Sequence, residues 1–247
     1  MFLYKAFVEY NGLFLFGWQK QIILPTVQSE IEKAISKIIS QKIFIFSGSR
    51  TDSKVHAFFQ IIYFRLNTKF SEKKLQHGLN YLLFRKKIVI KKVRLIYYGF
   101  HSRYDIKSKI YFYRILNRSS PSMLDIALSW HIFIPLNIYI MSKAASYLVG
   151  KHDFSSFRAK GCQAISPIIT LNRVNIIKPS NNIILIIFEA QSFIYHQIRI
   201  IVGTLVQFGL EKYSHILMKK ILNLKSRKFT NIIAPAYALY LKEIKYI

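Results

Sequence analysis

Residues 43–66 read IFIFSGSRTDSKVHAFFQIIYFRL and place two apolar segments on either side of a polar loop. The segments 43–46 and 55–66 are rich in Ile, Phe and Tyr, which favour β-strands. The loop between them sets Asp52 between Arg50 and Lys54. The stretch therefore predicts two strands joined by a loop that carries one carboxylate between two cationic side chains.

The rest of the chain continues this pattern. Alternating apolar residues predict further strands, and apolar residues at helical spacing predict helices, one of them capped by Thr26. The expected strands are 1–10, 88–96, 109–116, 172–177, 183–190 and 238–246, and the expected helices are 26–40, 72–83, 142–149, 194–208 and 215–222. Strands in hairpin-like pairs with a few helices between them indicate an α+β fold with a mainly antiparallel sheet. The similar element order of the two halves predicts two lobes, 1–104 and 105–247, with a central basic cleft and helices on the outer face.

Composition narrows the class of protein. The 247 residues include 37 Lys and Arg against 11 Asp and Glu, a formal net charge of +26, yet 52% of them are hydrophobic. A disordered basic tail is excluded, because disorder requires low hydrophobicity. The charge predicts a polyanionic partner such as a nucleic acid. An alternative is that part of the lysine excess reflects AT-rich codons, so the arginines Arg50, Arg103, Arg158 and Arg199 are the better guides.

Several other classes find no support in the sequence. Cys162 is the single cysteine, so an intramolecular disulfide is excluded and a cysteine-based zinc site is not expected. No signal-peptide pattern is present, and the longest uncharged apolar run, 126–142, is too short and too polar to span a membrane. These features predict a cytoplasmic protein with no membrane segment. Phosphate-loop, dinucleotide-binding, serine-hydrolase and zinc-protease motifs are missing, so we expect neither a metal nor a cofactor.

Asp52 is the carboxylate that the sequence singles out, because acidic residues are scarce and this one has cationic neighbours. Nearby positive charge favours the ionised carboxylate, which then has the character of a nucleophile. The alternative, taken from the local pattern alone, is that Asp52 caps a turn and pairs with Arg50.

The loop resembles the G-R-T-D-x-G-V-H signature of the tRNA pseudouridine synthase A family, and further segments resemble that family in the same order. They are 10–12 with 17–21 and 26–28 (YNG, GWQKQ, TVQ), 100–104 with 109–113 (FHSRY, KIYFY), 152–158 with Cys162 (HDFSSFR), 193–203 (FIYHQIRIIVG), and 234–235 with Ala238 in place of glycine (AP). The resemblance covers nearly the whole chain.

The resemblance implies an enzyme of the pseudouridine synthase fold, a homodimer without a cofactor, that isomerises uridine to pseudouridine at positions 38, 39 and 40 in the anticodon stem-loop of tRNA. It implies that Asp52 is the nucleophile, that Arg199 is its ion-pair partner and that Tyr111 stacks on the target uracil. The RNA-binding residues implied are Arg50, Phe100, His101, Ser102, Arg103, Tyr104, Arg158, Gly161, Cys162, Gln163, Ala164 and Ile165.

The chain departs from the family pattern at the loop itself. Ser49 and Lys54 replace glycines, and Ser53 replaces the usual alanine, so a left-handed backbone at either glycine position would be costly here. Ile165 stands where a basic residue is expected. These departures leave a second function open, that of a catalytically weak or inactive tRNA-binding protein or RNA chaperone of the same fold, and a basic ribosome-associated structural protein is a third.

Overall fold

The computed structural model describes residues 1–96 and 106–246, and the chain divides into two compact units. Met1–Lys107 and Tyr240–Ile247 form the first unit, and Ser108–Leu239 form the second. The sequence pattern predicts that all of 105–247 forms one lobe. Residues from Tyr240 onward group instead with the first unit, because β10 (Leu239–Tyr246) pairs in parallel with β3 (His56–Leu66).

In the first unit, β1 (Phe2–Tyr10) lies between β3 and β4 (Ile88–Ile96) and pairs antiparallel with both. The short β2 (Ile45–Ser47) pairs antiparallel with β3. Alternate residues of β1 are buried, namely Tyr4, Ala6, Val8 and Tyr10. This alternation is the period of a strand with one face on the core.

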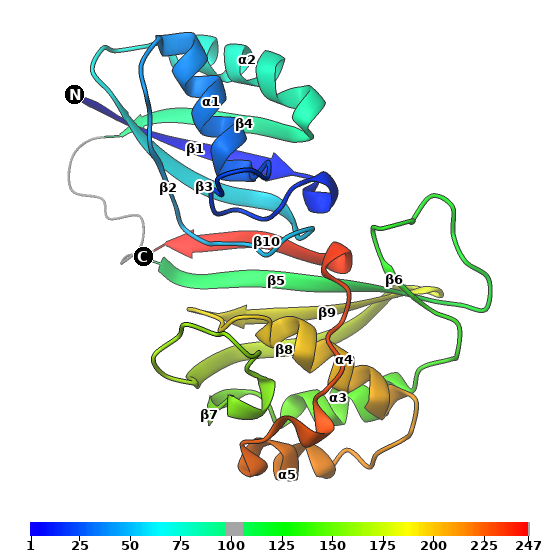
Figure 1. The fold of residues 1–247 in the computed structure, drawn as a ribbon. Coiled ribbons are helices and arrows are strands. Elements are labelled where there is room, and N and C mark those ends of the chain that lie inside the picture. The colour runs from blue at the N-terminus through cyan, green and yellow to red at the C-terminus, as the bar shows by residue number, and fades with distance from the viewer. Residues whose placement is uncertain (97–105, 247) are drawn as a thin grey trace. The chain divides into compact units, whose positions relative to one another are not determined.

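Two helices, α1 (Val27–Ile39) and α2 (Glu72–Leu83), cover that buried face (Figure 1). Thr26 caps α1 as predicted: its side chain accepts a hydrogen bond from the Ser29 amide, and the Ser29 hydroxyl accepts one from the Thr26 amide. Leu75, Leu79 and Leu83 recur at helical spacing and form the buried stripe of α2.

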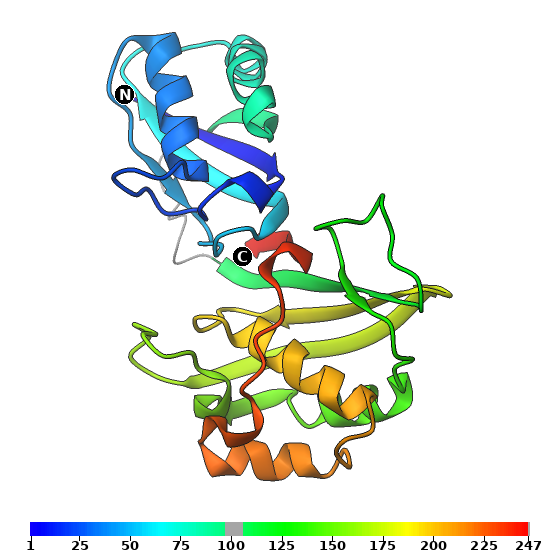
Figure 2. The ribbon, with the colours of Figure 1, turned by 45° about the vertical axis from the view of Figure 1, so that its right-hand side comes forward.

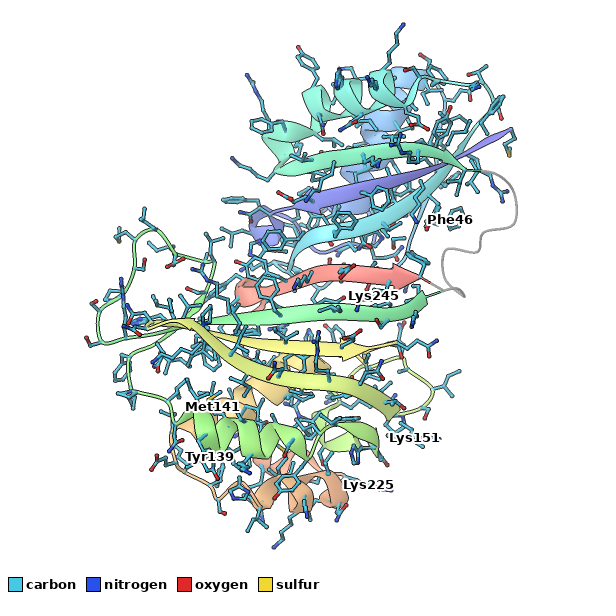
Figure 3. The ribbon with its side chains drawn as sticks, turned by 180° about the vertical axis from the view of Figure 1, so that it is seen from behind. Phe46, Tyr139, Met141, Lys151, Lys225 and Lys245 are labelled. Atoms are coloured by element: carbon cyan, nitrogen blue, oxygen red, sulfur yellow. The ribbon has the colours of Figure 1, made fainter. Side chains whose placement is uncertain are left out.

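In the second unit, β5 (Ile106–Asn117), β9 (Ile183–Ala190), β8 (Ile168–Ser180) and β7 (Gly150–Asp153) pair antiparallel in that order. The short β6 (Trp130–Ile132) runs parallel to β5. The helices are α3 (Ile138–Ser146), α4 (Gln197–Gly209) and α5 (Leu217–Leu224). Figure 2 shows α4 against the sheet of this unit. Met141 of α3, labelled in Figure 3, is fully buried where α3 meets α4 at Gly209.

The described part of the chain also contains five single-turn 3-10 helices: η1 (Gly12–Phe14), η2 (Phe84–Lys86), η3 (Ser155–Phe157), η4 (Arg227–Phe229) and η5 (Ala236–Ala238). Within 1–96 and 106–246, no helix has the length and apolar character needed to span a membrane.

The mainly antiparallel α+β architecture confirms the predicted fold class. Helix α3 begins at Ile138 rather than at 142, because the Asn137 side chain caps it by accepting a hydrogen bond from the Ile140 amide. Helix α4 begins at Gln197 rather than at 194, because His196 has a left-handed backbone (φ 61°). The strands β6 and β7 were not predicted, since three or four residues give too short a pattern.

Candidate active site

The loop that carries Asp52 connects β2 to β3 in the first unit, and hydrogen bonds fix its backbone to residues 15–18. The Trp18 amide donates to the Thr51 carbonyl at 3.0 Å, and the Lys54 amide donates to the Leu15 carbonyl at 3.2 Å. A further bond of 3.2 Å, from the Val55 amide to the Asp52 carbonyl, closes the turn. Asp52 itself is half-buried. The backbone on both sides of the carboxylate is therefore held in place.

Two glycines allow this close approach of segments about forty residues apart. Gly17 has φ +85°, and a Cβ there would lie 3.0 Å from the Thr51 carbonyl oxygen. A Cβ on Gly12 would overlap the carbonyl group of Val55. The Gly12 amide also donates to Nδ1 of His56 at 3.2 Å. The family-like segments around Gly12 and Gly17 thus have a physical role, which is to support the Asp52 loop.

Buried side chains hold the same loop from the core. The hydroxyl groups of Tyr10 and Thr51 share a hydrogen bond of 2.7 Å, and Gln60 Nε2 donates to the Ser49 carbonyl at 2.8 Å. Thr51 and Ser49 are buried, whereas Arg50 and Lys54 are exposed. Ser49 and Thr51 therefore anchor the loop, whereas the side chains of Arg50 and Lys54 present positive charge to solvent on either side of Asp52. Tyr10 and Thr51 stand in segments that resemble the family, but the sequence predicts no supporting role for them or for Gln60. The three residues lie on separate strands or in the loop, and no local pattern indicates this network.

Of the two residues that stand in place of family glycines, one has the left-handed backbone for which a free-energy cost is expected. Lys54 has φ +66°, in the left-handed region, whereas Ser49 has no positive φ. A residue other than glycine pays about 1–2 kcal/mol for that conformation. The hydrogen bonds donated by the Lys54 and Val55 amides require this turn. The loop therefore retains both bonds, and the backbone of Lys54 is strained.

In the second unit, Arg199 lies in the first turns of α4 and is half-buried. Its Nε donates to the Ala234 carbonyl at 2.8 Å, and the Ala234 amide donates back to the Arg199 carbonyl at 3.0 Å. One turn further along α4, Gly203 lacks the Cβ that would overlap the Ile232 carbonyl. The absence of a side chain at Gly203 therefore lets residues 232–235 lie directly on α4 and hold the guanidinium group.

Two tyrosines of β5 lie on the same face of the sheet, because residues i and i+2 of a strand point to the same side. The Tyr113 hydroxyl donates to the Pro235 carbonyl at 2.9 Å, next to the residue that holds Arg199. Burial raises the pKa of Tyr113 well above its ordinary value, and Tyr237 adds to the rise. Tyr111 is 6% exposed and meets Phe193 edge to face, with ring centroids 5.3 Å apart. The sequence assigns a role to Tyr111. Tyr113, Ala234 and Pro235 lie in segments that resemble the family, but no role is predicted for them.

The loop that follows η3 contains further RNA-binding candidates. Arg158 donates through one guanidinium nitrogen to the carbonyl oxygens of Cys162, at 3.0 Å, and Ala164. Partial burial acts to raise the pKa of the Cys162 thiol, but hydrogen bonds from the backbone at Ala164 and Tyr195, together with Arg158, outweigh it and lower that pKa. Arg158 thus shapes its own loop. Gly161, Gln163 and Ile165 are exposed.

The predicted residues are distributed over both units. Asp52 and Arg50 belong to the first unit, and Tyr111, Arg199 and the loop around Cys162 belong to the second. The pairing of Asp52 with Arg199 stays a prediction, as does phosphate binding by Arg50 and Arg158. The remaining candidates, Phe100, His101, Ser102, Arg103 and Tyr104, lie outside the described residues. Within the described ranges, no group of three or more His, Cys, Asp or Glu side chains is placed to hold a metal ion.

Comparison with known proteins gives a consistent result. The family model described as tRNA pseudouridine synthase matches residues 144–247. The chain is 41% identical over 244 residues to the tRNA pseudouridine synthase A of Wolbachia pipientis wMel, covering 98% of this chain and 99% of that protein. It is 39% identical over 245 residues to the tRNA pseudouridine synthase A of Anaplasma phagocytophilum (strain HZ), again covering 98% and 99%.

The family model and these relatives identify the class of protein as an isomerase that modifies tRNA. The chain belongs to the tRNA pseudouridine synthase A family, as its resemblance to the family's motifs predicted.

Proposed function

We propose that this chain isomerises uridine to pseudouridine at positions 38, 39 and 40 in the anticodon stem-loop of tRNAs, with Asp52 as the nucleophile. The observation that carries the proposal is the anchoring of the Asp52 loop. Hydrogen bonds from Trp18 to Thr51 and from Lys54 to Leu15 fix the backbone on both sides of the carboxylate. Such pre-organisation is what a nucleophile needs, because a displacement of about 1 Å is enough to lower the rate of a reaction strongly.

The chemistry requires no group beyond the side chains and the substrate. The Asp52 carboxylate attacks either C1′ of the ribose or C6 of the uracil, and the sequence and the fold leave both routes open. In the first route the C1′–N1 bond breaks as the C1′–oxygen bond forms, the uracil rotates, and its C5 bonds to C1′ as the carboxylate leaves. C5 then loses its proton and N1, which left C1′ with the electron pair of the broken bond, takes up a proton, so the conjugated uracil ring is restored and atoms and electrons balance without an oxidant or a reductant.

Other residues receive roles that fit their surroundings. Arg199 pairs with the carboxylate of Asp52, and Tyr111 stacks on the uracil once the base leaves the RNA helix. Arg50, Arg103 and Arg158 contact phosphates of the RNA. Residues 100–104, around Arg103, and residues 161–165, around Cys162, do the same. The chain acts in the cytoplasm as a homodimer, and sedimentation at several protein concentrations tests that state of assembly.

Release of tritium tests the nucleophile. Anticodon stem-loop RNA carrying C5-tritiated uridine at one of the three positions loses tritium to water when pseudouridine forms. We expect Asp52→Asn, which keeps the shape of the side chain, to lower the release rate at least about a thousandfold while RNA binding is retained.

The matched control is Asp125→Asn, which removes a carboxylate that pairs with Arg114 at 2.6 Å in the second unit. It should release tritium at close to the native rate. Equal release by Asp52→Asn and the native protein would exclude Asp52 as the nucleophile. RNA binding without release by the native protein would favour the alternative function, a non-catalytic tRNA-binding protein.

A further inference from the structure

Lys54 combines a strained backbone with an exposed positive charge. Its φ of +66° lies in the left-handed region, where glycine is favoured, and its side chain is exposed. It lies two residues from Asp52, in the turn closed by the hydrogen bond from the Val55 amide to the Asp52 carbonyl. A glycine would relieve the strain without changing a hydrogen bond of this loop, since the lysine contributes only its amide.

Other left-handed lysines of the chain have a local use for their charge. Lys87 and Lys225 both end helices, where the negative end of the helix dipole favours a cation. Lys225, labelled in Figure 3, also pairs with Asp153 at 3.1 Å. Lys54 ends no helix, and among the described residues it forms no ion pair. Neither a helix end nor an ion pair within residues 1–96 and 106–246 therefore accounts for its charge.

We propose that the Lys54 ammonium group binds a phosphate of the RNA substrate beside the target nucleotide, and that this contact compensates for the strained backbone at the same residue. The inference rests on the proposed function of the Asp52 loop. The chemistry is that of a point charge on a flexible stem, which suits a phosphate approached from solvent. Arg50, exposed on the other side of Asp52, would form the second cationic contact of the same loop.

The test is the salt dependence of RNA binding, measured with anticodon stem-loop RNA. Each phosphate contact adds about 0.7–0.9 to the slope of log K against log salt concentration. We expect Lys54→Gly to lose one such contact, so that between 50 and 200 mM salt the affinity of the native protein falls about threefold further than that of the variant. Relief of strain should at the same time raise the melting temperature by about 2 °C. Lys54→Arg, which keeps the charge, should restore the native slope.

Two control variants separate charge from strain. Lys74→Gln removes an exposed cation from α2 and should leave the slope unchanged. Ser40→Gly relieves an uncharged left-handed residue (φ 55°) at the end of α1 and should raise the melting temperature without affecting RNA binding. An unchanged slope in Lys54→Gly, or the same loss of slope in Lys74→Gln, would overturn the proposal.

Failure of the proposed function would give a different result. If the native protein bound the RNA but released no tritium, the proposed isomerase activity would be excluded. The difference in salt slope between the native protein and Lys54→Gly would still decide whether Lys54 contacts a phosphate.

Discussion

Arg199 and Ala234 exchange two hydrogen bonds across 35 residues of sequence, one from Nε to the Ala234 carbonyl and one from the Ala234 amide to the Arg199 carbonyl. The bond through Nε fixes one edge of the guanidinium group. Since Pro235, the next residue, accepts the Tyr113 hydroxyl, the orientation of Arg199 depends on the position of a short segment that β5 also holds.

Tyr113→Phe removes the hydroxyl that holds Pro235 and should therefore loosen the support of Arg199. We expect the free energy of unfolding to fall by about 1 kcal/mol, because a partly buried carbonyl loses its donor. We also expect kcat to fall severalfold with KM unchanged, if Arg199 acts on Asp52 and not in RNA binding. Chemical denaturation and tritium-release kinetics measure the two effects. The control is Tyr147→Phe, which removes a hydroxyl group that lies 3.4 Å from Nδ1 of His215. Equal kcat values for the two variants would contradict the prediction.

Gly203→Ala should destabilise the second unit, because the new methyl group would overlap the Ile232 carbonyl and neither backbone is free to move away. We expect a loss of about 1–3 kcal/mol in the free energy of unfolding. In Gly78→Ala the new methyl group meets only the flexible end of Ile38, at 3.2 Å. That substitution should stabilise α2 by about 0.5–1 kcal/mol, as is usual for alanine in a helix. Urea denaturation of both variants gives the comparison, and a neutral Gly203→Ala would show that residues 232–235 do not pack tightly on α4.

Cys162 should react with iodoacetamide at a lower pH than an ordinary thiol does. Its pKa is lowered because backbone hydrogen bonds and Arg158 stabilise the thiolate more than partial burial disfavours it, and the thiolate is the reactive form. The alkylation rate measured against pH should therefore reach half its maximum below the usual thiol pKa. Arg158→Gln should move that midpoint upward, whereas Lys160→Gln, which removes an exposed neighbouring charge, should move it little. The reverse order would show that Arg158 does not stabilise the thiolate.

Glu72 should make the stability of the first unit sensitive to acid. Its pKa is lowered by hydrogen bonds from the Leu95 amide, at 2.8 Å, and from Arg94, at 2.6 Å. The unfolded chain therefore binds a proton more readily than the folded one, so the contribution is complete above the unfolded pKa, near 4.5, and is lost as the pH falls through the lower folded value. Glu72→Gln should flatten the pH dependence of the denaturation midpoint below about pH 5. An unchanged profile would mean that the carboxylate is protonated alike in both states.

Much of the fold can be predicted from the sequence, because the interactions that define an element join neighbouring residues. The alternation of β1, the leucine stripe of α2 and the cap at Thr26 all follow from contacts within a few positions, and the structure has them as predicted. The Asp52 loop also stands out in the sequence, since a carboxylate between Arg50 and Lys54 is conspicuous in so basic a chain.

The sequence by itself determined the elements of the fold, the family and the identity of the candidate nucleophile. Only the tertiary structure decided what holds these groups: the supports of the Asp52 loop at Tyr10 and Gln60, the left-handed backbone of Lys54, and the segment at Ala234 that holds Arg199. The physical reason is that a side chain finds such a partner through the path of the chain in space. That path depends on the packing of whole strands and helices, which no local pattern of residues contains.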